Sequence, residues 1–484
     1  MGMYRKASRS GAVRSFRALA AGALFCMATA GAWAQALPDS VNQAWAKSGL
    51  PEAARSLYVQ EVGQPPLWQI SADVPRNPAS VMKLVTTWAA LSELGPSYTW
   101  RTEMLADPGA LPDAQGRLNG PLYIRASGDP MLRFQDFWNL LRELRLRGIK
   151  QLGDIVVDRS VFGAVSIDPG AFDGSADRAY NASPDAFMVG FGATRLLFLP
   201  DPVARKWTPV MDPPLNGVRF EGEVTWSDAR CPGAPVVSTT PVITPDGVRI
   251  RLAGTVAGSC GEFSFYRLAQ SQPEQTEQVL RYLWRELGGE LRGRIRNGTV
   301  PVDAVPLAAH ESPPLIEAIS LINKFSNNVA ARNLLLTLGA ESGQRPAQVA
   351  TAAQTAANTL ARQGIDVAGL NIDNGAGLSR RASVSASTLG HMLEAAWLSP
   401  RMPEYVSSMA ILGLDGTVRR RLRDRDTQGM AHLKTGSLRD VRAIAGYVTS
   451  ASGKRYIVVS MINHDNAIAG RAYEDSLIDW LIRQ

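Results

Sequence analysis

The chain has 484 residues, 45% of them hydrophobic and 20% charged, a composition typical of a globular protein with two or three domains. Its formal net charge is +7, but five basic residues precede the first acidic residue, Asp39, and without them the net charge is about +2. That balance gives no electrostatic case for a nucleic-acid partner. Histidine is scarce and no Cys-x-x-Cys pair occurs, so we expect neither a metal site nor a cofactor.

Residues 1–34 have the pattern of a secretory signal peptide. A basic start is followed by an apolar, Ala-rich run from Ala18 to about Ala30, and Ala32-Trp33-Ala34 is a small-x-small cleavage site. The alternative, a membrane anchor, is weaker because the run falls short of the about 20 residues that a span requires. We therefore expect cleavage after about Ala34 and a periplasmic protein with at most peripheral membrane contact.

After this leader, the predicted elements begin with two strands, over 53–62 and 67–72, in which apolar residues alternate loosely. A helix follows, with Asn77 as its N-cap and Pro78 at its first position, and Gly95 ends it.

The segment after about Tyr98 has a different pattern. An amphipathic helix over 134–147 lies between short strands at 122–125 and 155–158, which predicts a βαβ-like or α+β module. Residues 196–265 are rich in Pro, Gly, Val and Thr, and they predict a small β-rich subdomain.

Cys231 and Cys260 are the two cysteines that remain after removal of the leader. In an oxidising compartment an isolated pair predicts one disulfide, and the alternative is two free buried thiols.

Helices return in the second half of the chain, and strands return near its end. The predicted helices cover 274–287, 315–322, 327–338 and 346–363, with Pro346 at the first position of the last. The predicted strands cover 431–435, 443–449 and 456–462, and a helix over 472–482 ends the chain.

Strands and a helix thus occur at both ends of the chain, with an unlike block between them. We predict a main domain of 35–97 and 300–484, an insert domain of 98–195 and 266–299, and a subdomain, 196–265, nested in the insert.

Three short motifs carry the chemistry. In Ser80-Val81-Met82-Lys83 the hydroxyl and the amine lie one helical turn apart at a helix N-terminus, where backbone N–H groups stabilise an oxyanion. Ser326-Asn327-Asn328 lies between two predicted helices, and Lys434-Thr435-Gly436, followed by Ser437, lies on a predicted strand. Taken singly, each motif has an ordinary alternative: a helical turn with a surface lysine, an N-cap at a helix corner, and a strand end with a glycine bulge.

The order of the motifs favours the functional interpretation. S-x-x-K, S-D-N and K-T-G form the set found in serine β-lactamases and penicillin-binding proteins. All three occur here in that order, with Asn327 in place of the middle Asp, and an export signal accompanies them.

On these motifs the chain resembles the class C low-molecular-mass penicillin-binding proteins, the DacB-type D-alanyl-D-alanine carboxypeptidase/endopeptidases. The long gap between the first two motifs is similar to that family, whereas Asn374 and Ala376 depart from its D-G-S-G-L-S-R pattern and Gly190 and Gly192 from its insert. The resemblance implies an α/β (α+β) transpeptidase/β-lactamase-like domain, with a five-stranded antiparallel sheet, helices on both faces and two nested insert domains. The matching segments are Asn77 to Lys83, Gly128 to Pro130, Gly153 to Asp158, Asp373 to Arg380, Gly413 to Thr417 and Lys434 to Leu438.

The predicted mechanism makes Ser80 the acyl acceptor and a neutral Lys83 its base, because no G-x-S-x-G elbow is present. Lys434 is expected to lower the pKa of Lys83 and to hold the substrate carboxylate. Ser326 is expected to relay a proton to the leaving nitrogen, and Asn328 to bind the substrate amide and position Lys83.

Further roles are implied by the resemblance alone. Backbone N–H groups of Ser80 and Ser437 would form the oxyanion hole, and Thr435 and Gly436 would contribute to substrate binding. Arg380 and Asp177 would contact the diamino-acid side chain of the peptide; the alternatives are a surface ion pair and a loop acid.

The predicted function is a serine D-Ala-D-Ala carboxypeptidase/endopeptidase. Its partners would be peptidoglycan stem peptides ending in D-Ala-D-Ala or joined by D-Ala cross-links, with β-lactams as covalent inhibitors. One rival is a serine β-lactamase, which differs in its deacylation rate. Another is a catalytically weak peptidoglycan-binding protein. The sequence does not decide between trimming a terminal D-alanine and cutting cross-links.

Overall fold

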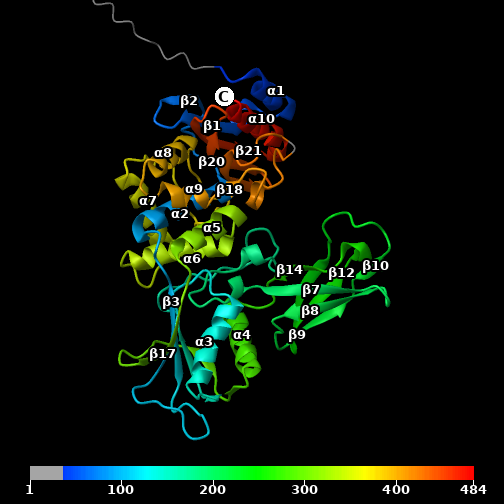
Figure 1. The fold of residues 1–484 in the computed structure, drawn as a ribbon, viewed down its shortest axis with the longest axis vertical. Coiled ribbons are helices and arrows are strands. Elements are labelled where there is room, and N and C mark those ends of the chain that lie inside the picture. The colour runs from blue at the N-terminus through cyan, green and yellow to red at the C-terminus, as the bar shows by residue number, and fades with distance from the viewer. Residues whose placement is uncertain (1–35, 424) are drawn as a thin grey trace, which may run out of the picture. The chain divides into compact units, whose positions relative to one another are not determined.

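The structure, a computed structural model, describes residues 36–423 and 425–484, so the expected signal peptide lies outside the described residues. The described strands form six sheets, and the largest of them carries part of the candidate site (Figure 1). Within the described ranges, no helix combines the length and the hydrophobicity needed to cross a bilayer.

The largest sheet joins the two ends of the chain. Its strand order is β18-β19-β20-β21-β1-β2, and each neighbouring pair is antiparallel. Five strands were expected; the sixth, β18, has only two residues, which is too short to show an alternating pattern. The strands are β1 (Arg55–Glu61), β2 (Pro66–Ile70), β18 (Ala410–Ile411), β19 (Ala431–Leu438), β20 (Val441–Thr449) and β21 (Arg455–Asn463).

Both faces of this sheet are apolar in its central strands, because successive residues point to opposite faces and most of them are hydrophobic. Helices therefore cover both faces. Leu57 and Val59 of β1 pack against α1 (Asp39–Ser48) and α10 (Arg471–Ile482), which lie side by side (Figure 1). Tyr58, between them in sequence, joins the core of the opposite face. That core contains α2 (Met82–Leu94), α5 (Leu315–Phe325), α6 (Asn328–Glu341), α7 (Val349–Arg362), α8 (Ala386–Trp397) and α9 (Met402–Ser407).

A second sheet, of order β16-β6-β4-β3-β17, is built from the middle of the chain. Strands β4 and β6 are parallel and α3 connects them, which confirms the expected βαβ unit. Helix α4 lies beside α3 (Figure 1). The elements are β3 (Arg101–Ala106), β4 (Leu122–Arg125), α3 (Phe134–Leu146), β6 (Ile155–Asp158), α4 (Gln272–Glu286), β16 (Ile295–Asn297) and β17 (Val305–Glu311), with a two-stranded sheet of β5 (Gln151–Leu152) and β15 (Glu290–Leu291).

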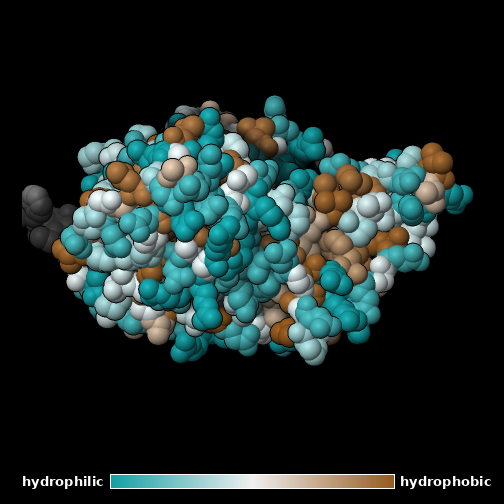
Figure 2. All heavy atoms as spheres, turned by 90° about the horizontal axis from the view of Figure 1, so that it is seen from below, coloured by the Kyte–Doolittle hydropathy of each residue, from teal (hydrophilic) through white to brown (hydrophobic). Residues whose placement is uncertain are grey.

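Three small sheets between Thr194 and Arg267 form the β-rich region. Cys231 and Cys260 are bridged there with an S–S distance of 2.06 Å, which confirms the predicted disulfide. Figure 2 shows hydrophobic residues grouped on this region, at the right of the view. The strands are β7 (Thr194–Asp201), β8 (Lys206–Asp212), β9 (Val218–Gly222), β10 (Thr225–Ser227), β11 (Ser238–Thr244), β12 (Gly247–Ala253), β13 (Thr255–Ala257) and β14 (Phe263–Arg267).

Two predicted helix starts are wrong. The helix at Asn77 begins instead as a 3₁₀ turn, η2 (Ala79–Val81), and becomes α-helical at Met82. Helix α7 begins at Val349, so that Pro346 precedes the helix rather than occupying its first position.

Candidate active site

Ser80 lies in the turn η2, directly before α2. The turn is fixed by Asn77, whose side-chain oxygen accepts a hydrogen bond of 2.9 Å from the backbone N–H of Ala79. Asn77 is itself tied to β21 through Asn463, by two hydrogen bonds of 2.9 Å each. Ala79 has a φ of 45°, a left-handed conformation that is rare for a non-glycine residue and frequent at functional sites. Asn77 and Ala79 therefore hold Ser80 in a 3₁₀ turn and not in the first turn of a regular α-helix.

Lys83 is buried, with 0% of its surface exposed, beneath Ser80. Its Nζ donates hydrogen bonds to Ser80 Oγ at 3.0 Å, to Asn328 Oδ1 at 2.6 Å and to the carbonyl of Ala376 at 2.6 Å. None of the three partners is a carboxylate, and two of them, Asn328 Oδ1 and the Ala376 carbonyl, can only accept. When the amine is neutral, its two N–H groups satisfy these acceptors and its lone pair accepts from the Ser80 hydroxyl.

The environment of Lys83 opposes its positive charge. Burial holds the pKa of Lys83 well below its usual range, and the nearby charges of Lys434 and Arg332 lower that pKa further. An amine in this state is able to accept a proton from a neighbouring hydroxyl.

Ser326 and Asn328 occupy the corner between α5 and α6. Ser326 ends α5 with a φ of 60°, and Asn327 caps α6 by accepting a hydrogen bond of 2.9 Å from the N–H of Ala330. Asn328 is the first residue of α6, and its side-chain amide donates to the carbonyl of Tyr180 at 3.1 Å. The corner thus directs Ser326 and Asn328 toward the lysines from the first and third motifs.

Lys434 is the second buried lysine of the site, on strand β19. Its Nζ donates to Ser326 Oγ at 2.9 Å and to the carbonyl of Thr435 at 2.8 Å. Burial lowers the pKa of Lys434 to about 7. The structure therefore brings Ser80, Lys83, Ser326, Asn328 and Lys434 together, as the sequence predicted.

Gly436 explains why the third motif requires a glycine. A Cβ atom at this position would lie 2.4 Å from the carbonyl oxygen of Pro78 and 3.1 Å from the backbone nitrogen of Ser80. Only glycine lets β19 approach η2 this closely. The contact places the strand that carries Lys434 next to the backbone of Ser80.

The remaining residues of the third motif are more accessible. Thr435 is half-buried, and its hydroxyl lies 2.8 Å from that of Thr417, a contact that motif reasoning did not anticipate. Ser437 is exposed, directly after the Gly436 contact with η2.

Arg380 and Asp177 have other partners. Arg380 is exposed, donates to Asp440 Oδ1 at 2.5 Å, and lies 4.8 Å from the centre of the Phe172 ring. Asp177 Oδ2 lies 3.0 Å from Arg267 Nε and accepts a hydrogen bond of 3.0 Å from Thr239. The carboxylate of Asp177 is thus held by two residues of the β-rich region, Arg267 on β14 and Thr239 on β11.

Arg332 is a site residue that sequence reasoning missed. It lies one turn after Asn328 on α6, is buried, and donates to the carbonyls of Ala182 at 2.7 Å and Tyr180 at 3.3 Å. Burial lowers its pKa to about 10. The spacing of four residues on one helix face is the signal that links Arg332 to Asn328.

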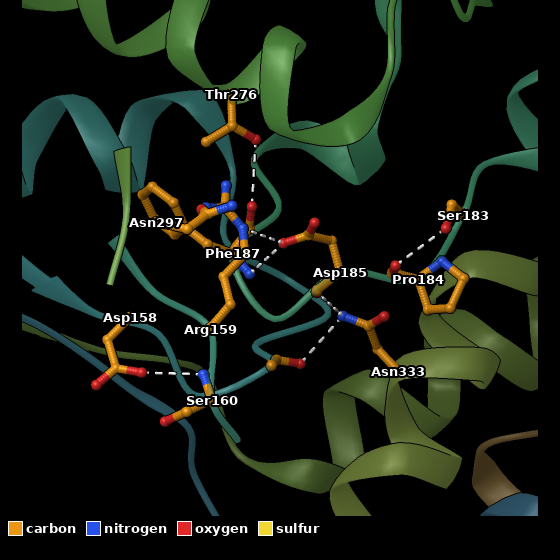
Figure 3. A network of polar contacts seen from close by, with 11 residues as sticks. Asp158, Arg159, Ser160, Ser183, Pro184, Asp185, Phe187, Thr276, Asn297 and Asn333 are labelled. Atoms are coloured by element: carbon orange, nitrogen blue, oxygen red, sulfur yellow. Dashed lines mark hydrogen bonds and ion pairs between the residues drawn. The ribbon is translucent and has the colours of Figure 1, made fainter. Parts of the chain in front are cut away.

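A polar network anchors α6 to the middle of the chain (Figure 3). The Asn333 side chain donates to the carbonyls of Asp185 at 2.9 Å and Gly128 at 3.2 Å. Asp185 in turn accepts hydrogen bonds from Arg159 Nε at 2.9 Å and the N–H of Phe187 at 2.8 Å. These bonds tie the helix that carries Asn328 to segments outside the main sheet.

The chain is similar to known proteins in sequence and in fold. Residues 37–484 match the family model described as the D-Ala-D-Ala carboxypeptidase 3 (S13) family. The chain is 27% identical over 395 residues to the D-alanyl-D-alanine carboxypeptidase DacB of Haemophilus influenzae, covering 80% of each chain. It is 28% identical over 407 residues to a D-alanyl-D-alanine carboxypeptidase of Actinomadura sp. strain R39, covering 81% of this chain and 73% of the relative. The fold is similar to that of penicillin binding protein 4 from Haemophilus influenzae in complex with a β-lactam, with a TM-score of 0.72, 24% identity, and coverage of 92% of this chain and 100% of that chain.

Proposed function

Because this chain belongs to the D-Ala-D-Ala carboxypeptidase 3 (S13) family, we propose that it is an exported serine peptidase that cleaves D-alanyl peptide bonds in peptidoglycan through an acyl-enzyme on Ser80. The observation that carries this proposal is the buried amine of Lys83, which lies 3.0 Å from the Ser80 hydroxyl and has no carboxylate partner among its hydrogen bonds. A serine hydroxyl is a weak nucleophile until a base removes its proton, and Lys83 supplies that base.

Acylation begins when neutral Lys83 takes the proton from Ser80 Oγ as the oxygen attacks the substrate carbonyl. Asn328 holds the Lys83 amine and binds the substrate amide. The backbone N–H groups of Ser80 and Ser437 stabilise the oxyanion. Ser326 passes a proton to the departing nitrogen and regains one from the proton that Lys83 took, so Lys83 is neutral again. Lys83 then takes a proton from the water that attacks the ester, and this proton returns to Ser80 Oγ as the acid is released.

Lys434 binds the terminal carboxylate of the substrate. Its pKa of about 7 means that it is only partly charged when the site is empty. An arriving carboxylate raises that pKa and restores the charge. The hydroxyl of Thr435, beside that of Thr417, completes this end of the site, next to the close approach at Gly436.

For the side chain of the substrate's diamino acid we keep Arg380 as a binding residue, because it is exposed beside Phe172. We assign Asp177 a structural role instead, because Arg267 and Thr239 occupy its carboxylate.

We further propose that the main sheet and its helices are the catalytic domain, 35–97 and 300–484. Residues 98–195 with 266–299 would form an insert domain, and 196–265 a subdomain nested in it. The sheets built from the middle of the chain support this division except at one boundary. Strand β17 (Val305–Glu311) pairs with β3 in the insert's sheet, which favours a return to the catalytic domain after Glu311. A periplasmic location agrees with a peptidoglycan substrate and with the disulfide.

The products from two substrates test the activity. Incubation with a monomeric muropeptide ending in D-Ala-D-Ala and with a D-Ala cross-linked dimer, followed by chromatographic separation, should show release of D-alanine, cleavage of the dimer, or both. Absence of every product would refute the proposed function. Rapid turnover of a chromogenic β-lactam would favour the β-lactamase, which the family membership does not support.

A further inference from the structure

A cleft of about 550 Å³ opens beside Ser326 and Asn328. Its far walls come from the start of α3, from the segments around Tyr180 and Phe191, and from Tyr266 on β14. The volume lies in the range of sites for drug-sized ligands, about 300–1,000 Å³, and greatly exceeds what a single leaving D-alanine needs.

Exposed aromatic side chains converge on this cleft. Among residues 36–423 and 425–484, the exposed aromatic side chains are Tyr180 at 43%, Tyr266 at 51% and Phe325 at 65%, and all three line it. Single exposed apolar residues are ordinary, but their convergence in one concave site from three distant segments marks a binding surface.

The backbone around Phe191, in the wall of the cleft, has an unusual conformation that brings it close to the ring of Phe134. Phe191 has a φ of 58° and lies between Gly190 and Gly192, both also left-handed. A Cβ atom at Gly190 would lie 2.6 Å from the ring of Phe134, so glycine is required for the wall to close on that ring. Strained non-glycine residues of this kind are concentrated at ligand sites.

The charge of the lining limits the ligand. Arg133, at the N-terminus of α3, is the charged residue among the lining side chains, and none of them is acidic. The cleft therefore suits a chain with apolar faces and carboxylates, and none of its lining side chains is a carboxylate that could pair with a bound cation.

The position of the cleft indicates which part of a substrate it receives. Both Ser326, assigned above to protonate the leaving nitrogen, and Asn328, assigned to the substrate amide, line the cleft. The cleft extends from these residues, so a strand attached to the leaving nitrogen enters it beside Ser326. We propose that the cleft binds the leaving strand of a D-alanyl cross-link, an acidic peptide attached through its amine, and thereby selects cross-linked over monomeric substrates. This inference rests on the proposed function.

The test compares two substrates in two cleft variants, Tyr266→Ala and Phe325→Ala. The ratio of kcat/KM for a D-Ala cross-linked muropeptide dimer to that for a monomeric pentapeptide should fall about tenfold in each, as expected for truncating an aromatic contact. Leu146→Ala, a change at an exposed position on the last residue of α3 and outside the cleft lining, should keep the wild-type ratio. The acylation rate with penicillin, which lacks a leaving peptide strand, reports whether the reaction centre is intact in each variant.

A wild-type ratio in both cleft variants, or an equal loss on both substrates, would overturn the inference. A wild-type protein that trims the pentapeptide but does not cut the dimer would also overturn it, while the proposed peptidase activity would stand. A wild-type protein that forms no penicillin adduct and releases no product would instead refute the proposed function.

Discussion

Lys434 Nζ donates a hydrogen bond of 2.9 Å to Ser326 Oγ across 108 positions of sequence. The bond connects strand β19 to the corner between α5 and α6, and so joins the third motif to the second. The close approach of Gly436 to η2 joins the third motif to the first. The proposed catalysis depends on these two connections.

The pH dependence of acylation should report the depressed pKa of Lys83. Because burial and nearby cations disfavour its protonated form, the second-order rate of penicillin acylation should rise with pH and level off well below the usual lysine pKa of 10.5. Lys83→Arg, which cannot lose its proton, should reduce the rate about 10²–10⁴-fold. A midpoint near the usual lysine pKa would contradict the role of Lys83 as a neutral base.

Arg332 should tune that midpoint. Its positive charge lowers the pKa of Lys83, so Arg332→Gln should raise the pKa and move the ascending limb of the profile to higher pH. Arg332→Lys keeps the charge and is the matched control, with a limb near that of the wild type. Equal shifts in both variants would mean that Arg332 acts through its hydrogen bonds to Ala182 and Tyr180 and not through charge.

Gly436→Ala should damage the site through packing. The new methyl group would collide with the carbonyl of Pro78, at a cost of about 1–3 kcal/mol and with displacement of β19 from η2. Chemical denaturation should show the loss of stability, and acylation should slow. Gly153→Ala is the control, because the nearest atom to its added Cβ is 3.9 Å away and its φ is not left-handed. An unchanged acylation rate in Gly436→Ala would show that the close approach is not needed.

Lys434 should make the free energy of unfolding depend on pH. Its pKa is about 7 in the folded protein and near 10.5 when unfolded, so the unfolded chain binds more protons between these values. Stability should therefore rise from about pH 7 to 9.5, by about 3 kcal/mol at most from this group. Lys434→Met should lose that part of the slope, whereas Lys206→Met, at an exposed position, should keep it. The same slope in Lys434→Met and the wild type would contradict a buried, depressed lysine.

Much of the fold follows from local patterns. Strands β4 and β6 begin and end where the sequence predicts, because short apolar runs are bounded there by turn residues. The motif order predicted the cluster around Ser80, since each motif is short and lies on the element its chemistry needs.

Features that depend on distant contacts were not predictable. The strand β18 exists through its pairing with β19, and the turn η2 depends on bonds from Asn77 to β21. The engagement of Asp177 by Arg267 and Thr239 joins segments far apart in sequence. The aromatic cleft likewise needs Tyr180, Tyr266 and Phe325 to meet in space.

The most direct test of the central claim is the intact mass of the protein after treatment with penicillin. The wild type should gain the mass of one drug molecule, because the Ser80 hydroxyl becomes an ester. Ser80→Ala should gain nothing while its thermal unfolding remains that of the wild type. An adduct of the same mass on Ser80→Ala, or none on the wild type, would contradict the assignment of Ser80 as the acylated residue.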